Sequence, residues 1–209
     1  MRAMGRSTTP LYIILLLVAG CATQPSIEPV TSSEPIPVHN DILVSPPKGD
    51  DWYRMADRRG PLEFGLKPPS EDLKHTFLLL VGYWNGLDVN DPGTPAALKA
   101  GVAKNLESRN ADRRHSITSS VSSPYRFEGT DCVHYDITQE ERDNPGFPAG
   151  TVLTLTDHGF FCRHPYSSEI VQAFYSERYK QGEKSLLHGT VKEEAESFLN
   201  SIQFTRPSS

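Results

Sequence analysis

Alternating apolar and polar residues mark several strands in the second half of the chain. The alternation covers residues 117–121, 133–137 and 171–175, with the period of two that is typical of strands burying one face. A nearly continuous apolar run at 75–84 is long enough for a central strand, and 151–163 is rich in β-prone residues. Together these segments predict a β-sheet.

Another segment repeats its apolar residues at helical spacing. Leu98, Val102 and Leu106 recur every four residues and give one apolar stripe that ends near residue 108. In front of the stripe, Thr94 offers an N-cap and Pro95 the proline that is favoured at the first helical position. A helix is therefore predicted from Pro95.

A second helix is predicted at 190–201. Thr190 and Glu193 match the T-x-x-E capping box, in which the two side chains satisfy the free backbone N–H groups of a helix start. The apolar residues behind them fall on one face: Val191, Ala195, Phe198, Leu199 and Ile202.

Helices at two places among these strands predict an α+β fold. We expect a mainly antiparallel sheet, packed with two or more helices and covered on one side. Residues 51–209 are assigned to a single globular domain, because this length supports one core and nothing in it repeats. Turns are predicted at 144–146 and Gly182, and Gly159 predicts a β-bulge.

Residues 21–50 follow a different pattern. Prolines are dense there and the apolar residues show no period. Such a segment buries too little apolar surface to offset the entropy lost on ordering it. It is predicted to be a disordered tether, a flexible linker in front of the domain.

Residues 1–20 have the order of an export signal. Arg2 and Arg6 precede an apolar run at 11–19, about half of the ~20 apolar residues that a membrane-spanning helix needs. The end of this run, Leu17-Val18-Ala19-Gly20-Cys21, resembles the lipobox of bacterial lipoproteins. The alternatives are an ordinary signal peptide that contains a cysteine, or a buried N-terminal helix.

The resemblance to lipoproteins implies a lipid anchor. The signal peptide 1–20 would be cleaved off and Cys21 would carry the acyl chains, such as palmitate, that make a lipid bilayer the first partner of the chain. Ala22 stands where an aspartate favours inner-membrane retention in proteobacterial lipoproteins. The implied location is the cell envelope, at the outer membrane and facing the periplasm.

Net charge narrows the classes of partner. The precursor carries −5, and removal of residues 1–20 with their two arginines leaves −7. A chain without a basic run lacks the positive patch by which proteins bind nucleic acid. We therefore expect no nucleic-acid partner.

Besides Cys21, the mature chain contains two cysteines, Cys132 and Cys162. In an oxidising compartment an even pair predicts a disulfide, which would close a loop of about 30 residues. Two buried free thiols are the competing interpretation. A metal or redox pair is disfavoured, because the spacing resembles neither CxxC nor a zinc ribbon.

A disulfide between neighbouring antiparallel strands would also fix the register, with opposed residue numbers adding to 294. Asp136 then faces His158, while His134 and His164 lie on opposite sides of the bond, about 13 Å apart along the strands. One metal ion cannot bind both histidines. The pattern thus predicts a local Asp136–His158 pair, retained as a weak candidate ligand site, rather than a metal centre.

The remaining candidates for chemistry are few. The chain has no G-x-S-x-G motif and no cofactor-binding loop, so neither a catalytic nucleophile nor a cofactor is predicted. Tyr83 and Trp84 are adjacent aromatic residues at the end of the predicted central strand. They are expected to pack in the core or, alternatively, to line a binding groove.

Three segments carry a family resemblance. Phe160-Phe161-Cys162-Arg163-His164-Pro165, Tyr175-Ser176-Glu177-Arg178 and the segment 196–204 are similar to a family of uncharacterised proteobacterial lipoproteins. The closing Phe198-Leu199-Asn200-Ser201-Ile202-Gln203-Phe204 also resembles the end of Mog1/PsbP-like domains. Those domains pack helices against an antiparallel sheet, and the lipoprotein family implies no known reaction.

These observations favour a non-catalytic binding or assembly module of the envelope, with an unknown protein, peptide or glycan as its partner. The alternative is a small periplasmic enzyme with its site around Asp136 and His158. A purely structural or stress-related surface protein is the third hypothesis.

Overall fold

A computed structural model describes residues 26–56, 60–67, 75–84, 94–109 and 113–206. The predicted signal peptide, Cys21 and the start of the predicted tether lie outside these residues. None of the helices among the described residues is long and apolar enough to cross a membrane.

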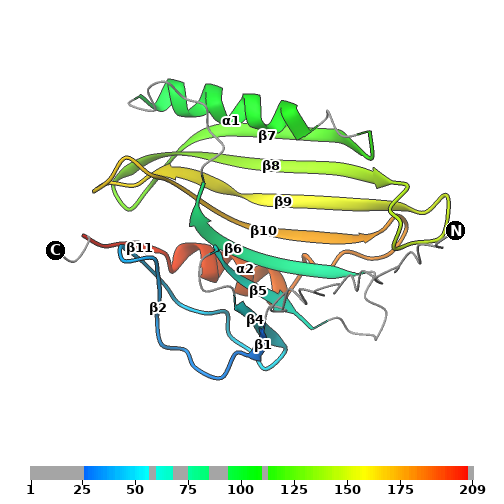
Figure 1. Cartoon of the computed structure of the whole chain (residues 1–209), viewed down its shortest axis with the longest axis horizontal. Helices are drawn as coiled ribbons and strands as arrows, with labels where there is room; N and C mark the ends of the chain where they lie inside the picture. Colours follow the sequence, from blue (N-terminus) through cyan, green and yellow to red (C-terminus); the bar gives the residue numbers. More distant parts are fainter. Residues whose placement is uncertain (1–25, 57–59, 68–74, 85–93, 110–112, 207–209) are drawn as a thin grey trace, which may run out of the picture.

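An eight-stranded antiparallel sheet forms the body of the domain (Figure 1), in the order β1-β4-β5-β6-β10-β9-β8-β7. Its strands are β1 (Ser26–Pro29), β4 (Trp52–Ala56), β5 (Leu62–Leu66), β6 (Thr76–Tyr83), β7 (His115–Phe127), β8 (Thr130–Arg142), β9 (Val152–Arg163) and β10 (Ile170–Lys180). Among the described residues β1 and β7 are therefore the edge strands of this sheet. The predicted strands are confirmed, and β7 contains the serine-rich stretch around Val121.

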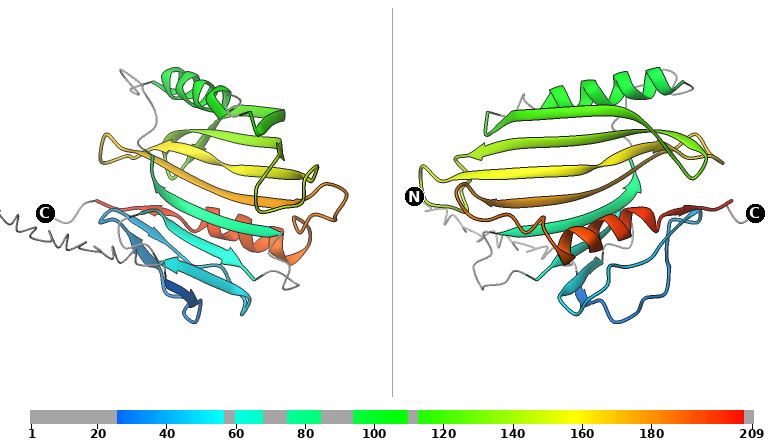
Figure 2. Two further views of the ribbon diagram at one scale, coloured as in Figure 1. Left: turned by 45° about the vertical axis from the view of Figure 1, so that its right-hand side comes forward. Right: turned by 180° about the vertical axis from the view of Figure 1, so that it is seen from behind.

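Two helices pack on opposite faces of this sheet (Figure 2). On one face, α1 (Pro95–Arg109) buries Leu98, Val102 and Leu106 against β8 and β9. On the other, α2 (Thr190–Asn200) buries Ala195 and Phe198 in a core shared with β4, β5, β6 and β10. The α+β class is thus confirmed, but the helices cover both faces of the sheet, because the two apolar stripes serve separate hydrophobic cores.

The two helix starts differ from each other. Thr94 caps α1 as predicted, since its Oγ1 accepts a hydrogen bond from the backbone N–H of Ala97 at 3.2 Å. The predicted capping box of α2 is wrong: the N-cap is Gly189, which has a φ of 58°, and no side chain caps this end. The helix starts one residue earlier than the box requires, so the Thr190 side chain is already inside the first turn.

The prediction of a tether is wrong for residues 26–50. This segment contains β1 and two strands of a small sheet, β2 (Ile36–Val38) and β3 (Ile42–Val44), which pair with each other and with β11 (Gln203–Phe204). Ile42 and Val44 are fully buried. Composition alone missed these strands because they are only three or four residues long and only β2 and β3 pair locally. β1 pairs with β4, and β3 also pairs with β11, where Leu43 lies opposite Gln203.

The turn predictions are confirmed, but the bulge is misplaced. The N–H of Phe147 donates to the Asn144 carbonyl at 3.0 Å, and Gly182 has a φ of 91°. The ladders on both sides of Gly159 run without interruption. The irregularity in register lies in β7, between Ile117 and Ser119.

Candidate functional site

The disulfide fixes the geometry of the candidate site. Cys132 on β8 and Cys162 on β9 are bonded to each other and lie directly opposite in the antiparallel ladder. Both are almost completely buried. The predicted disulfide and its register are confirmed, and the alternative of two free thiols is wrong.

Asp136 and His158 are opposed in that register, as predicted. His158 Nδ1 lies 2.5 Å from Asp136 Oδ1, and because an ionised carboxylate only accepts, the imidazole donates. His134, two residues along β8, places its Nδ1 3.6 Å from the other oxygen, Oδ2. The three side chains form what we name the His–Asp–His row. His164 lies apart from it, buried with its Nε2 3.2 Å from the Asp41 carbonyl oxygen.

The His–Asp–His row lies on the α2 side of the sheet, where the helix does not cover β8 and β9 (Figure 2, right). Its side chains are 31–41% exposed. Val121 on the edge strand β7 lies opposite Asp136 and is 58% exposed, and Tyr125 lies opposite Cys132 on the same face. The row with Val121 and Tyr125 is named the open strip below.

The pair of Asp136 and His158 orients the imidazole. Donation from Nδ1 leaves the lone pair of Nε2 available, and no hydrogen bond to Nε2 comes from the described residues. This nitrogen can accept a hydrogen bond from a ligand or remove a proton from it. Among the described residues, no serine hydroxyl or cysteine thiol is hydrogen-bonded to it, so the geometry includes no ready nucleophile.

Tyr175 forms the inner border of the open strip. Its ring lies 5.0 Å from the ring of His158, and the side chain is nearly buried beneath α2. Burial, together with the negative charges of Glu196 and Asp136, raises the pKa of Tyr175 to about 12. The phenol is therefore neutral at physiological pH, and its hydroxyl can donate or accept a hydrogen bond but does not act as an anion.

The raised pKa of Tyr175 predicts a loss of stability in alkali. Its folded-state pKa of about 12 exceeds the ordinary value of 10.0, so its contribution is complete below pH 10 and is lost as pH rises through 12. In urea unfolding, Tyr175→Phe should lose less stability than the parent chain between pH 10 and pH 12. Both proteins should still decline, because burial also raises the pKa of Tyr83 and Tyr179. Identical declines would contradict this assignment.

Tyr83 and Trp84 do not form a common groove. As neighbours at the end of β6 they project to opposite faces of the sheet. The Tyr83 ring stacks on His39 at 4.4 Å and its hydroxyl donates to Asp41. The Trp84 ring lies 4.7 Å from Phe161, in the core that α1 covers. The core-packing interpretation holds for both residues, and the hypothesis of a groove between them is wrong.

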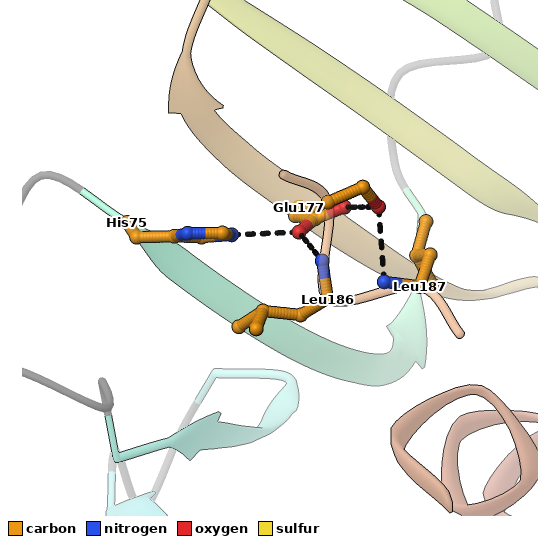
Figure 3. Close-up of polar contacts among 5 residues, drawn as sticks. His75, Glu177, Leu186 and Leu187 are labelled. Atoms are coloured by element: carbon orange, nitrogen blue, oxygen red, sulfur yellow. Dashed lines mark hydrogen bonds and ion pairs between the residues drawn. The ribbon is translucent and has the colours of Figure 1, made fainter. Parts of the chain in front are cut away.

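The sequence analysis missed a buried carboxylate, Glu177 on β10 (Figure 3). Its Oε1 accepts hydrogen bonds from His75 Nε2 at 2.6 Å and from the Leu186 N–H at 2.5 Å. Its Oε2 accepts from the Ser185 hydroxyl at 2.6 Å, and Ser185 Oγ in turn accepts from the Leu187 N–H. The carboxylate stands between the serine and the histidine, so His75 cannot take the serine proton.

Glu177 therefore anchors the loop that leads into α2. The missed signal was its position, because residues 171, 173, 175 and 177 alternate on the buried face of β10. An acidic residue at such a position requires several donors, since a buried charge without partners is strongly unfavourable.

Among the described residues, no group of three or more histidine, cysteine and acidic side chains is arranged to hold a metal ion.

Comparisons with known proteins add little to this picture. No known protein family and no curated protein matches this sequence. The structure is similar to that of LpqN, which is described as involved in cell envelope biogenesis of Mycobacterium tuberculosis. The two sequences are 14% identical, the TM-score is 0.47, and the match covers 86% of this chain and 91% of LpqN. It is also similar to a cyanobacterial PsbP from Synechocystis sp. PCC 6803, with 12% identity, a TM-score of 0.29, and coverage of 84% and 98%. Because both TM-scores are below 0.5, neither similarity supports a conclusion about this chain. The α+β class rests on the strands and helices themselves.

Proposed function

We propose that this chain is a lipid-anchored protein of the cell envelope that binds a peptide or glycan on the open strip, without catalysis. One observation carries the proposal. Hydrogen-bonding side chains, the His–Asp–His row, are gathered beside exposed Val121 and Tyr125 on a sheet face that α2 covers elsewhere. Polar groups next to exposed apolar and aromatic ones are what a peptide or glycan requires.

The anchor is argued from sequence and from the disulfide. The lipobox-like segment that ends at Cys21 supports acylation of that residue, and a buried disulfide within the fold suits an oxidising compartment. Ala22 supports the outer membrane, with the domain in the periplasm. The mature net charge of −7 argues against nucleic acid as the ligand.

The second candidate function is a small periplasmic hydrolase. The distance of 2.5 Å between His158 Nδ1 and Asp136 Oδ1 favours it, because a carboxylate that holds a histidine in one tautomer is the arrangement of a general base. His158 would then activate a water molecule, since no nucleophilic side chain is hydrogen-bonded to it among the described residues. The binding proposal is preferred because it requires nothing beyond the side chains present.

Photo-crosslinking in cells tests the proposal. A photoreactive amino acid in place of Tyr125 should capture an envelope component, whereas the same residue in place of Tyr166 should not, although Tyr166 is the more exposed of the two, at 48% against 36%. His158→Ala should then lower the yield at position 125 roughly tenfold, the effect of about 1.4 kcal/mol of lost hydrogen bonding. If the protein is an enzyme, the His158→Ala variant should still capture its substrate at position 125, and formation of the product should stop. Equal capture at 125 and 166 would contradict both functions.

The anchor has its own test. The parent chain should incorporate labelled palmitate and float with membranes, and Cys21→Ser should do neither. A parent chain that takes up no label would overturn the lipid anchor, whatever the result at the open strip.

A further inference from the structure

We infer that the outer face of the β1-β4-β5-β6 half of the sheet docks onto the lipid bilayer that anchors the chain. The inference rests on the acylation of Cys21 proposed above. It follows from where the fold begins, because β1 starts at Ser26, only five residues after Cys21. Five residues span at most about 18 Å when fully extended. The edge strand β1 is therefore held close to the bilayer surface.

The face next to this anchor point is apolar. Ile27, the second residue of β1, is 66% exposed and lines a groove of about 300 Å³. Tyr53 and Met55 of β4 line it as well, together with Leu78 of β6 and with Lys67. These five residues are named the β1 groove. The described part of α1 does not cover it, since α1 packs against β8 and β9.

The composition of the β1 groove fits the membrane interface. Isoleucine and methionine side chains can enter the acyl boundary, tyrosine is favoured at the level of the headgroups, and the lysine stem can lie along apolar surface with its ammonium group near phosphate. Glu63 lies opposite Met55 in the ladder, and the mature net charge is −7. A zwitterionic phospholipid surface is therefore the occupant, rather than a strongly anionic one.

The tether makes even a weak surface contact effective. An anchor within about 18 Å gives the groove a high effective concentration of lipid, so that little intrinsic affinity is needed. Ile27 projects from the groove instead of being enclosed, which favours a flat lipid surface over a single captured acyl chain. The open strip lies on the α2 face of the sheet, opposite the face that carries the β1 groove, and near the other edge strand, so a periplasmic ligand can reach it while the groove contacts lipid.

Fluorescence quenching by brominated lipids tests the docking. The acylated full-length mature chain is reconstituted into vesicles of phosphatidylethanolamine and bromine-labelled phosphatidylcholine, and Ile27→Trp is compared with Val121→Trp. Both parent residues are largely exposed, so neither substitution should disturb folding. After subtraction of the parent signal, quenching at position 27 should exceed that at position 121 by roughly twofold or more, as expected for a side chain inserted into the acyl boundary.

The outcomes separate the two proposals. If the acylated chain floats with the vesicles while positions 27 and 121 are quenched equally, the docking inference is wrong and the anchor stands. If the chain takes up no palmitate and does not float, the anchor is wrong and the docking inference falls with it. Stronger quenching at position 27 that disappears when Lys67→Glu is added would support the bilayer as the occupant.

Discussion

Replacement of Gly159 by alanine should lower the free energy of unfolding by at least about 3 kcal/mol, at the upper end of what overpacking costs. A Cβ at this position would overlap the backbone carbonyl oxygen of Ala173 and lie 2.5 Å from the Phe174 Cβ. Both belong to β10, the hydrogen-bonded neighbour of β9. Backbone atoms of a paired strand cannot move aside as a flexible side chain can, so the two strands would have to separate.

Gly65→Ala is the matched control for this change. Gly65 also lies within a strand of the same sheet, but a Cβ there would meet only the Leu78 and Met55 side chains, each at an ordinary 3.8 Å. Its stability should change by no more than about 1 kcal/mol, the usual range for glycine against alanine. Thermal unfolding of Gly159→Ala should show a Tm lower by roughly 6–12 °C. Equal Tm values for the two variants would show that β9 and β10 can adjust at Gly159.

The case of Gly159 shows where sequence patterns lose information. A glycine between two β-prone segments indicates either a bulge or a close approach of two backbones, and the sequence pattern is the same in both cases. The pattern led to a bulge, whereas the structure shows a close approach to Ala173 and Phe174. The actual irregularity, at Ile117 and Ser119, has no glycine to mark it.

The candidate site could be predicted where a covalent constraint fixed the geometry. One assumed disulfide between neighbouring antiparallel strands sets every pair along β8 and β9, which is why Asp136 and His158 could be placed opposite each other from sequence. Nothing comparable constrains residues 26–50, where β2 and β3 pair with each other, β1 depends on β4, and β3 also depends on β11. Strands of three or four residues that are interrupted by prolines leave no local period to detect.

The same argument explains why the open strip was recognised only in part. Asp136 and His158 were found through the register, but the exposure of Val121 and Tyr125 depends on how far α2 reaches across the sheet. α2 packs in the core that it shares with β4, β5, β6 and β10, so the His–Asp–His row on β8 and β9 lies beyond the helix. The uncovered area is therefore a consequence of where the helix packs on the sheet, which local sequence does not encode.

Removal of the disulfide, by Cys132→Ala together with Cys162→Ala, should lower the free energy of unfolding by about 3–4 kcal/mol. The bond closes a loop of 30 residues, and an unfolded chain without it gains the corresponding conformational entropy. The less constrained unfolded state also exposes more surface, so the urea m-value should rise as the midpoint falls. Changing both cysteines together avoids leaving a single reactive thiol, and reduction of the parent chain serves as the matched control.

Removal of the disulfide should lower the stability of the whole domain and leave the local geometry of Asp136 and His158 intact. Asp136 and His158 lie four residues from the cysteines along their strands and are also held by the backbone ladders of β8 and β9. In conditions where the double variant is folded, the imidazole proton of His158 should keep the NMR shift of a carboxylate-bound Nδ1–H. An unchanged urea midpoint would mean that the ladders alone determine stability here. A shifted imidazole signal in the folded variant would mean instead that the disulfide positions the His–Asp–His row directly.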